Sequence, residues 1–474
     1  MEREMAVDGD IPHEAVHEAL RAWHATGDAE PALLAELLLV RQHRAALPDA
    51  TSPLSQRLAT NELLLAAIAR LEEQDEIAAQ LLRWRFLDDQ TLMSVSHRLN
   101  VSEYTVSRMQ RSAIAMLTAI IGEQERDARA ALVDELESGL PPPTYTRLFG
   151  VAGLQRELAD LVLAGAAPWV AAVVGMGGIG KTALVDAVTR DVIPTLRFER
   201  VIWIRFDART LTGRSLSPEH TFHGLLAQLA SWLNVDGTNL PEEQLAQVRH
   251  RLKRAPHLVI VDNVESMAVT DFLLNHLVEL ANPGKFLLTT RIHPSGQAAV
   301  RTFSLPTLER ADAGALLRHH AGELGVSALA QAPDEEIDRI YAVTGGNPLA
   351  LKLVAGLLDL LPLSRVLQDL ARSRPGPVEE LYRHIYWQSW RTLNEPAKAL
   401  LQAMPLVSED GASDDYLQAL SGLSDDAFWP ALQELRARSL IEVRGTLDEK
   451  RYGVHRLTET FVRTEIVGWD HHDE

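Results

Sequence analysis

The stretch Trp169-Val-Ala-Ala-Val-Val-Gly-Met-Gly-Gly-Ile-Gly-Lys-Thr182 decides the fold of this chain. It opens with an apolar run, Val170 to Val174, of the kind that forms a buried parallel strand. Gly175 then begins a loop with four glycines, and the spacing as far as Lys181-Thr182 fits the pattern G-x-x-x-x-G-K-[ST]. A strand, such a loop and a helix in this order predict a parallel α/β sheet with a phosphate-binding loop.

A phosphate chain explains each residue type in this loop. Glycines let the backbone curl so that successive N–H groups point inward, and the helix expected from Thr182 to Arg190 offers its positive end to the same anion. Lys181 can reach the β- and γ-phosphates, and the Thr182 hydroxyl can ligate Mg²⁺. The alternative is a glycine-rich turn without a ligand. Nucleotide binding is favoured because an apolar strand precedes the loop and an amphipathic helix follows it.

Composition limits the other possibilities. A chain of 474 residues with 46% hydrophobic and 23% charged residues is expected to form several soluble domains. The formal net charge of −19 does not favour nucleic acid or an anionic membrane as the main partner, although a local basic face stays open. The chain has no cysteine, which excludes disulfides, thiol catalysis and cysteine metal sites and fits a cytoplasmic protein. It has neither an apolar signal core at Met1 to Ala6 nor an apolar run near the ~20 residues that span a bilayer, so we expect no membrane partner.

Breaks in the pattern divide the chain into predicted regions. Three prolines within Ser138 to Tyr145 mark one linker, and Ser373-Arg-Pro-Gly-Pro377 marks another boundary. Near the end, helices precede a hairpin expected from Leu440–Arg444 and Arg451–His455, which suggests a winged helix. The fold class is therefore multidomain, α and α/β. The predicted regions are an N-terminal helical region (1–60), a helix-turn-helix region (61–125), a linker (126–146), a P-loop nucleotide-binding domain with a parallel sheet (147–300), a helical domain (301–375) and a winged-helix domain (376–470).

Two further strands end in charged side chains. His257 to Asn263 is apolar until Asp262, and a carboxylate at the carboxyl end of a buried strand can hold Mg²⁺ beside the phosphate loop. An ordinary aspartate at a strand end is the alternative, and the upstream loop favours the metal. Lys285 to Arg291 ends in a cation that could sense the γ-phosphate. With the strand expected from Arg200 to Phe206, these runs alternate with helices, as a doubly wound parallel sheet requires.

A helix-turn-helix is expected in the N-terminal part. Thr91–Leu99 and Glu103–Leu117 read as helices around a tight turn, with Ser102 as N-cap of the second. The spacing and the basic residues around it resemble the C-terminal DNA-binding region of sigma factors. This resemblance implies that the second helix enters the major groove. The residues that would face DNA are Ser102, Glu103, Tyr104, Ser107, Arg108 and Arg111. The same fold also serves as a protein docking surface, so DNA and protein both stay open as its partner.

Residues from about 147 to 465 resemble the NB-ARC core of STAND-class signal-transduction ATPases. The resemblance rests on ordered motifs: Gly175–Thr182 as phosphate loop, Val201–Ile204 as second strand, Leu258–Asp262 as Walker B strand, Leu287–Arg291 as sensor, Gly345–Ala350 as the Gly-Leu-Pro-Leu-Ala element and Tyr452–Leu457 as the Met-His-Asp element.

The resemblance implies a site for ATP or ADP with Mg²⁺. Pro348 would pack on adenine, and His455 would touch the β-phosphate of ADP and lock a closed state. Thr182 and Asp262 would hold the metal, and Lys181, Asp262 and Arg291 would be the catalytic residues. The full nucleotide-binding set is Gly175, Met176, Gly177, Gly178, Ile179, Gly180, Lys181, Thr182, Ala183, Phe149, Pro348 and His455.

Three positions depart from the family pattern. Asn263 stands where a second acid usually orients the attacking water, so we expect a weak ATPase with slow hydrolysis, or one that uses another group such as Glu265. Arg456 replaces the aspartate of the Met-His-Asp element, which weakens or alters the expected lock. Gly150-Val151 replaces the usual Gly-Arg, which removes one contact on the adenine side.

Three hypotheses follow for the whole chain. The first is a switch that ADP holds closed and that exchanges ATP, opens and forms a homo-oligomer to signal in regulation or defence, with an unknown protein partner or sensor chain. The second is a DNA-binding transcription regulator that ATP modulates. The third is a non-catalytic scaffold that keeps nucleotide as a structural cofactor.

Overall fold

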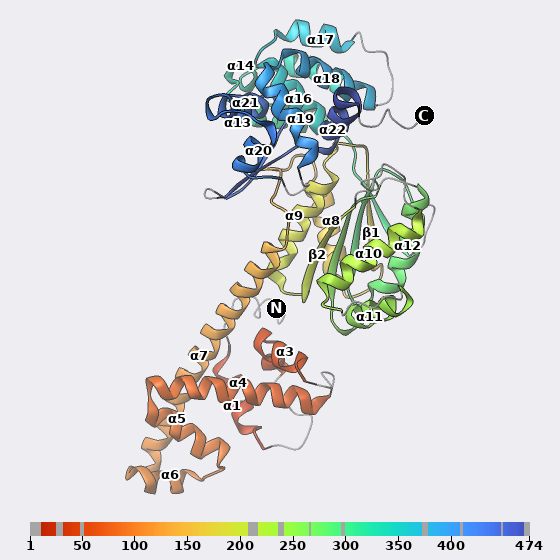
Figure 1. The fold of residues 1–474 in the computed structure, drawn as a ribbon. Coiled ribbons are helices and arrows are strands. Elements are labelled where there is room, and N and C mark those ends of the chain that lie inside the picture. The colour runs from red at the N-terminus through yellow and green to blue at the C-terminus, as the bar shows by residue number, and fades with distance from the viewer. Residues whose placement is uncertain are drawn as a thin grey trace. The chain divides into compact units, whose positions relative to one another are not determined.

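The computed structural model describes residues 11–24, 32–47, 52–206, 217–235, 241–264, 267–294, 299–371, 378–407, 411–446 and 449–468. The chain divides into two compact units, Met1–Glu135 and Leu136–Glu474, and Figure 1 shows the elements of each. The expected boundary segment Ser373–Pro377 lies outside the described residues.

The first unit is helical. Its elements are α1 (His13–Arg21), α2 (Ala32–Ala35), α3 (Leu38–Ala45), α4 (Pro53–Gln74), α5 (Glu76–Leu82), a π-helical turn (Arg83–Leu87), α6 (Leu92–Leu99) and α7 (Glu103–Ser138). Apolar side chains from these elements, most of them Leu, Ile, Val and Ala, form one buried core. Leu20, Leu64 and Leu71 in this core are fully buried. Burying these apolar side chains stabilises the helices against unfolding.

Helices α6 and α7 and the tight turn between them form where the sequence predicts. Thr91 caps α6 by accepting a hydrogen bond from the Ser94 N–H, and Asn100 ends the helix in the left-handed conformation at φ 54°. Asparagine tolerates this conformation better than most residues. Ser102 Oγ then accepts a hydrogen bond from the Thr105 N–H at 3.2 Å, which confirms Ser102 as the N-cap of α7.

Helix α7 is longer than its sequence predicted. It runs to Ser138, past the expected end at Leu117 and through much of the segment 126–146 that was expected to be a linker. The reason is local: Glu123 to Ser138 is rich in Glu, Ala, Arg and Leu, and no glycine or proline interrupts it before Gly139. The irregular part of the predicted linker therefore begins only after this helix.

A buried carboxylate on α7 caps helix α3. Glu125 is fully buried, and its oxygens accept hydrogen bonds from the backbone N–H groups of Leu38 at 2.8 Å and Leu39 at 3.1 Å. The first N–H groups of a helix have no partner within the helix, so a carboxylate here satisfies them and interacts favourably with the helix dipole. Arg129 lies 2.6 Å from the same carboxylate and balances its charge.

The second unit is built around a five-stranded parallel sheet. Its strands are β1 (Val170–Val174), β2 (Arg200–Arg205), β3 (His257–Val264), β4 (Lys285–Thr290) and β5 (Val300–Ser304), in the order β2-β3-β4-β1-β5. The predicted parallel α/β fold is confirmed. Because these strands run parallel, the phosphate loop after β1 and Asp262 near the end of β3 lie at the same edge of the sheet, with β4 between them.

Strand β5 was not expected from the sequence. It pairs with β1 at the edge of the sheet, and the predicted limit of the nucleotide-binding domain at residue 300 would cut it off from the sheet. Its residues Val300, Arg301, Thr302 and Ser304 are exposed or half-buried, and only Phe303 is buried. A short edge strand with so few apolar residues has no pattern that distinguishes it from a loop.

Helices cover both faces of the sheet, as Figure 1 shows. Helices α10 (Pro218–Trp232), α11 (Pro241–Arg254) and α12 (Met267–Ala281) share one apolar core with one face. Helix α9 (Lys181–Val192) follows the phosphate loop on the other face and packs beside α8 (Ala152–Leu163). The sheet thus carries helices on both faces and positions the loop at its edge.

The rest of the second unit is mainly helical. It comprises α13 (Arg310–Leu324), α14 (Ser327–Ala330), α15 (Asp334–Thr344), α16 (Pro348–Leu358), α17 (Leu363–Ala371), α18 (Val378–Thr392), α19 (Glu395–Ala403), α20 (Asp414–Ser421), α21 (Asp425–Ala437) and α22 (Arg456–Phe461). One hydrophobic core runs through the described part from Leu308 to Val462. The expected hairpin is present as β6 (Glu442–Gly445) and β7 (Lys450–Gly453). The winged-helix assignment and the six-region division stay predictions.

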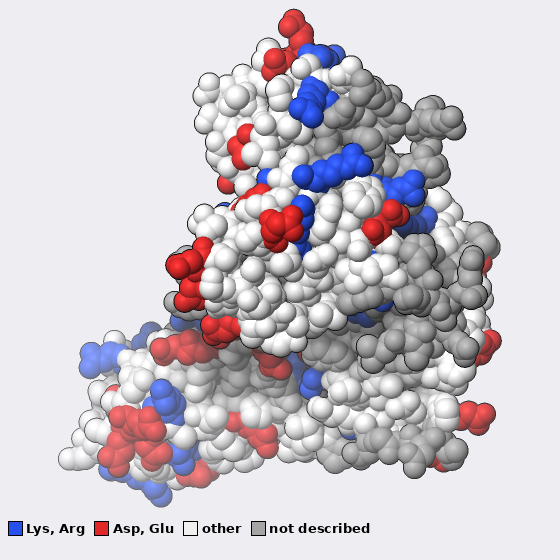
Figure 2. Space-filling view, turned by 45° about the horizontal axis from the view of Figure 1, so that its top comes forward, with Lys and Arg blue, Asp and Glu red and all other residues white. Residues whose placement is uncertain are grey.

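The surface carries charge of both signs. On the face in Figure 2, Lys and Arg side chains as well as Asp and Glu side chains are visible among the described residues. Within the described residues, no helix combines the length and the apolar character needed to cross a membrane.

The Glu125 cap gives a local stability prediction. We expect Glu125→Ala to speed amide hydrogen exchange at Leu38 and Leu39 at least about fivefold, because a buried donor left without an acceptor costs about 1–3 kcal/mol. Exchange is measured by mass spectrometry on the full chain. Glu123→Ala is the matched control, since Glu123 is exposed on the same helix. Equal exchange at α3 in both variants would contradict the capping role.

Candidate functional site

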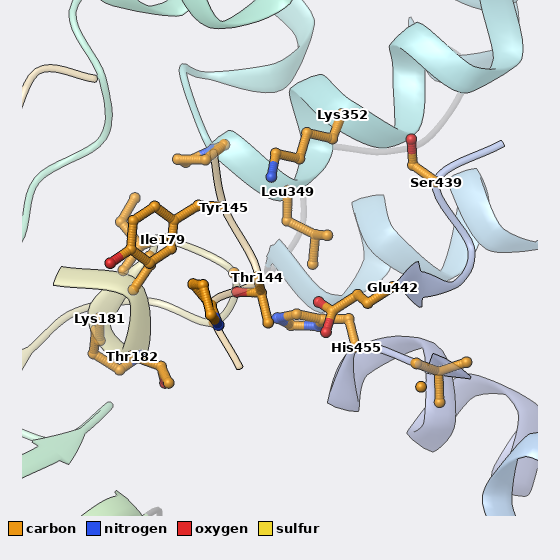
Figure 3. Close-up of a pocket in the computed structure, with 18 of the residues that line it drawn as sticks. Thr144, Tyr145, Ile179, Lys181, Thr182, Leu349, Lys352, Ser439, Glu442 and His455 are labelled. Carbon is orange, nitrogen blue, oxygen red and sulfur yellow. The ribbon is translucent and has the colours of Figure 1, made fainter. Parts of the chain in front are cut away.

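A cavity of about 730 Å³ lies in the second unit, where the phosphate loop faces the helical part. Its walls come from the loop and the start of α9, from the segment Pro143–Phe149, from α16, and from β6, β7 and the start of α22. Figure 3 shows Lys181 and Thr182 on one side of this space, with His455 and Glu442 on another. The volume falls in the range of pockets that enclose a small organic ligand.

The phosphate loop has the backbone that its glycines predict. Gly178 and Gly180 adopt φ values of +70° and +101°, which residues with a side chain rarely take. Gly180 is the N-cap of α9, so the helix N-terminus opens into the loop. The Lys181 ammonium donates to the carbonyl oxygens of Gly175 at 2.9 Å and Met176 at 3.0 Å, which places its charge across the loop. These donors and this charge suit a phosphate anion.

Asp262 lies beside Thr182, as the sequence predicts. Its side chain is 2% exposed, and its Oδ1 accepts hydrogen bonds from the Thr182 hydroxyl at 2.9 Å and from the Thr289 hydroxyl at 2.5 Å. Arg205 Nε, at the end of β2, lies 3.7 Å from Oδ2 of the same carboxylate. A hydroxyl and a carboxylate oxygen in contact form the hard-oxygen donor set that Mg²⁺ prefers, so these residues fit the metal. Neither Thr289 nor Arg205 was predicted as a site residue.

Asn263 has an unusual backbone at the expected position of a second acid. Its φ is +75°, at a point where the pairing of β3 with β4 shifts register. Its N–H donates to the Thr289 hydroxyl at 2.7 Å, and its side-chain amide donates to the Phe206 carbonyl at 3.2 Å. The amide is thus directed toward the end of β2 and has no basic group to offer. The alternative base, Glu265, lies outside the described residues.

Arg291 lies against the phosphate loop. It follows directly after β4, and its guanidinium carbon would be 3.1 Å from a Cβ built on Gly177. A larger residue at position 177 would therefore have to displace this cation. The geometry places a positive charge next to the loop from the strand that neighbours β1.

The segment Pro143–Phe149 is held across the cavity as one wall, and we call it the strap. Its Tyr145 hydroxyl donates to Asp186 Oδ2 on α9 at 2.8 Å, and burial raises the pKa of the Tyr145 phenol. Its Thr146 hydroxyl donates to Glu323 on α13 at 2.6 Å. The strap therefore ties a helix of the sheet layer to a helix of the helical part.

Phe149 and Pro348 both line the cavity, at the strap and at the start of α16. The Phe149 ring lies 5.5 Å from the His319 ring, and the Arg147 guanidinium lies 5.0 Å from the Phe149 centroid. This arrangement offers flat apolar surface with charge at its rim, which suits a planar base. His319 was not predicted from the sequence.

His455 reaches the cavity from the start of α22. Its Nδ1 accepts a hydrogen bond from the Leu457 N–H at 3.2 Å, so the neutral ring carries its proton on Nε2. Burial lowers the pKa of His455 to about 4; the charge of Glu442 opposes this shift, and those of Lys352, Arg291 and Lys181 add to it. The ring thus presents an N–H donor, which suits a phosphate oxygen. Lys352 and Glu442 also line the cavity but were not predicted, and the side chain of Arg456 lies outside the described set.

The residues that form the sheet and the phosphate loop also match a known protein family. Residues 154–323, which hold the phosphate loop, the whole sheet and α13, match the family model of the NB-ARC domain. This part of the chain is therefore similar to an NB-ARC domain. Its sheet and phosphate loop are those of a P-loop nucleotide-binding fold.

Two curated relatives are much longer than this chain. It is 26% identical over 266 residues to a putative disease resistance protein of Arabidopsis thaliana, which covers 53% of this chain and 30% of the relative. It is 27% identical over 321 residues to the regulatory protein AfsR of Streptomyces coelicolor, which covers 65% of this chain and 30% of the relative. The chain thus spans less than a third of the length of these relatives.

Among solved structures, the chain is similar to a signal transduction ATPase with numerous domains (STAND) from Pyrococcus horikoshii that has a tetratricopeptide repeat sensor. The TM-score is 0.44 at 22% identity, and the match covers 68% of this chain and 43% of that one.

The low pKa of His455 predicts a local pH dependence. The pKa is about 4 in the folded protein and near ~6.5 in an unfolded chain, so the neutral ring contributes stability above pH ~6.5 that is lost as the pH falls toward 4. We expect amide protection in α22, corrected for the intrinsic exchange rate, to fall over this range. His455→Asn keeps an acceptor for the Leu457 N–H but cannot titrate, so its protection should stay flat. The same pH profile in both proteins would refute this assignment.

Proposed function

We propose that the chain is an ATP/ADP-dependent switch of the STAND type. The observation that carries this proposal is the convergence of three elements on one cavity: the phosphate loop of the sheet, the start of α16 with Pro348, and His455 at the start of α22. A nucleotide in this cavity would contact all three at once. The nucleotide would then stabilise the arrangement in which these three elements meet, because it binds this closed form more tightly than a form in which they are apart.

The residues of the chain have distinct roles in this proposal. The loop from Gly175 to Ala183, with Lys181, binds the phosphates, and Pro348 and Phe149 enclose the base. Thr182 and Asp262 hold Mg²⁺, which would neutralise phosphate charge when bound. His455 donates its Nε2–H to the β-phosphate of ADP, and Arg291 meets the additional γ-phosphate of ATP. In this proposal ADP is the nucleotide that holds the chain closed.

Turnover is slow in this proposal. Asn263 is no base, and its amide is held by the Phe206 carbonyl, so the group that orients a water in faster ATPases has no counterpart at this position. A slow ATPase suits a switch, because the lifetime of the ATP-bound form then sets the duration of the signal. In that form we infer opening, homo-oligomer formation and contact with a protein partner or sensor chain, in a regulatory or defence role.

The nucleotide that co-purifies with the chain tests this proposal. We expect stoichiometric ADP in the wild type, released by denaturation and separated by chromatography. Lys181→Ala should bind ADP at least about tenfold more weakly, because it removes a charged hydrogen-bond donor. Lys253→Ala, which removes an exposed lysine from α11, should keep the bound ADP. Absence of nucleotide from the wild type and from both variants would refute the switch.

A second candidate function is DNA binding by the helix-turn-helix. The observation in its favour is the exposure of the predicted contact residues at the start of α7: Tyr104 is 75% exposed, and Ser102, Arg108 and Arg111 are also exposed, whereas Ser107 is half-buried. Other nearby arginines make contacts within the unit. Arg83 pairs with Glu72 at 2.7 Å, Arg85 hydrogen bonds to Gln110, and Arg98 lies over the Trp84 ring.

DNA contact predicts a salt-dependent affinity that Arg108 and Arg111 control. We expect Arg108→Ala/Arg111→Ala to weaken binding of a fluorescent duplex and to reduce the slope of log affinity against log salt by about 1.8, at ~0.9 for each lost phosphate contact. Fluorescence anisotropy at several salt concentrations measures both effects. Arg126→Ala, an exposed arginine further along α7, is the control. An unchanged slope in the double variant would favour protein docking.

A further inference from the structure

Side chains from the helical part hold the apex of the phosphate loop. The Gly177 carbonyl oxygen accepts a hydrogen bond from Asn347 Nδ2 at 3.1 Å and lies 3.2 Å from the Tyr382 hydroxyl on α18. The next carbonyl, of Gly178, accepts a bond from the Leu349 N–H at 3.3 Å. The loop is thus bonded from outside at two successive peptide groups.

This contact is buried and close. Asn347 is 2% exposed and Tyr382 is 3% exposed. A Cβ built on Gly178 would lie 2.6 Å from the Tyr382 hydroxyl and 2.7 Å from Leu349 Cβ. Position 178 therefore requires glycine for two separate reasons: its positive φ and the approach of α16 and α18.

Tyr382 also fixes the orientation of Asn347. The Tyr382 hydroxyl lies 2.5 Å from Asn347 Oδ1, so its single proton is shared between this oxygen and the Gly177 carbonyl. The same Oδ1 caps α16 by accepting from the N–H groups of Leu349 and Ala350. With Oδ1 so occupied, Nδ2 of Asn347 is the end of the amide that faces Gly177.

The geometry of the peptide group turns this outer bond into an effect on the phosphate site. In a planar trans peptide, the C=O of one residue and the N–H of the next point in opposite directions. A Gly177 carbonyl held outward by Asn347 therefore holds the Gly178 N–H toward the inside of the loop. Such inward N–H groups are the donors that bind phosphate oxygens.

Helix α18 connects this contact with the helix that carries His455. The Tyr382 ring stacks on Tyr386 with centroids 6.3 Å apart, and Tyr386 stacks on Phe461 of α22 at 5.3 Å. The Thr458 hydroxyl donates to the Tyr386 hydroxyl at 3.0 Å. The loop apex and the helix behind His455 thus share one buried aromatic row.

We propose that Asn347 and Tyr382 are positioning residues that hold the Gly177–Gly178 peptide of the phosphate loop in its phosphate-binding orientation, so that α16 and α18 control how fast ADP leaves. This inference rests on the proposed nucleotide binding and extends it to residues that touch the loop but not the ligand. When these helices move away, the carbonyl of Gly177 loses its partners and the loop loses one oriented donor.

The test uses the full chain and a fluorescent ADP analogue. Its dissociation is followed by stopped flow after mixing with excess ADP, for Tyr382→Phe and Asn347→Ser. Tyr382→Phe keeps the ring and removes only the hydroxyl. Asn347→Ser keeps a good cap for α16 but is too short to reach Gly177. We expect both variants to release the analogue about tenfold faster, the factor that one such hydrogen bond carries.

Two controls separate positioning from general stability. Tyr416→Phe removes an exposed tyrosine hydroxyl on α20, and its release rate should equal that of the wild type. The melting temperature of each nucleotide-free variant should stay close to the wild-type value. Release rates within twofold of the wild type for both variants would overturn the proposal, as would faster release that merely follows a lowered melting temperature.

Failure of the proposed function would look different. A wild type that binds no ADP refutes nucleotide binding and the positioning role together. A wild type that binds ADP, loses it in Lys181→Ala and releases it at an unchanged rate in Tyr382→Phe and Asn347→Ser refutes the positioning role alone.

Discussion

One carboxylate shared by two threonine hydroxyls joins the phosphate loop to the rest of the sheet. Asp262 stands at the end of β3, Thr182 at the start of α9, and Thr289 on β4 between them. Because strand β4 separates β1 from β3, the loop and the carboxylate are not on neighbouring strands, and Thr289 occupies the space between them. A buried carboxylate needs such partners, since an ionised group without them is very costly to remove from water.

The loop is therefore held from two sides by different parts of the fold. On the inner side are the sheet, Asp262 and Arg291, all fixed by the covered parallel strands. On the outer side are Asn347 and Tyr382, which belong to helices that follow the sheet in sequence. The inner contacts are part of a continuous rigid layer. The outer ones depend on how the helical part packs against the loop, and they are the contacts through which the proposed closure would affect ligand binding.

Local patterns predicted the local structure well. The strand–loop–helix around Lys181, the four apolar strands, the cap at Ser102 and the hairpin of β6 and β7 each depend on residues close in sequence. Strand β5 escaped prediction because only Phe303 in it is buried, and α7 exceeded its predicted length because a charged helical run resembles a linker in composition. The partners of Gly177 stand 170 and 205 residues away, and no spacing rule links such positions. Only the folded chain shows that an asparagine beside Pro348 and a tyrosine on α18 meet at one carbonyl.

The strap has a consequence for how this architecture can be recombined. Its residues read in sequence as a proline-rich connector, the kind of place where modules are exchanged between proteins. Yet Tyr145 and Thr146 fasten it to α9 and α13, and it forms one wall of the cavity. A crossover upstream of residue 140 would give the second unit a new N-terminal partner and leave the residues that line the cavity unchanged. A crossover between Pro143 and Phe149 would replace residues that line the cavity. A recombination point that keeps the cavity intact therefore lies before the strap.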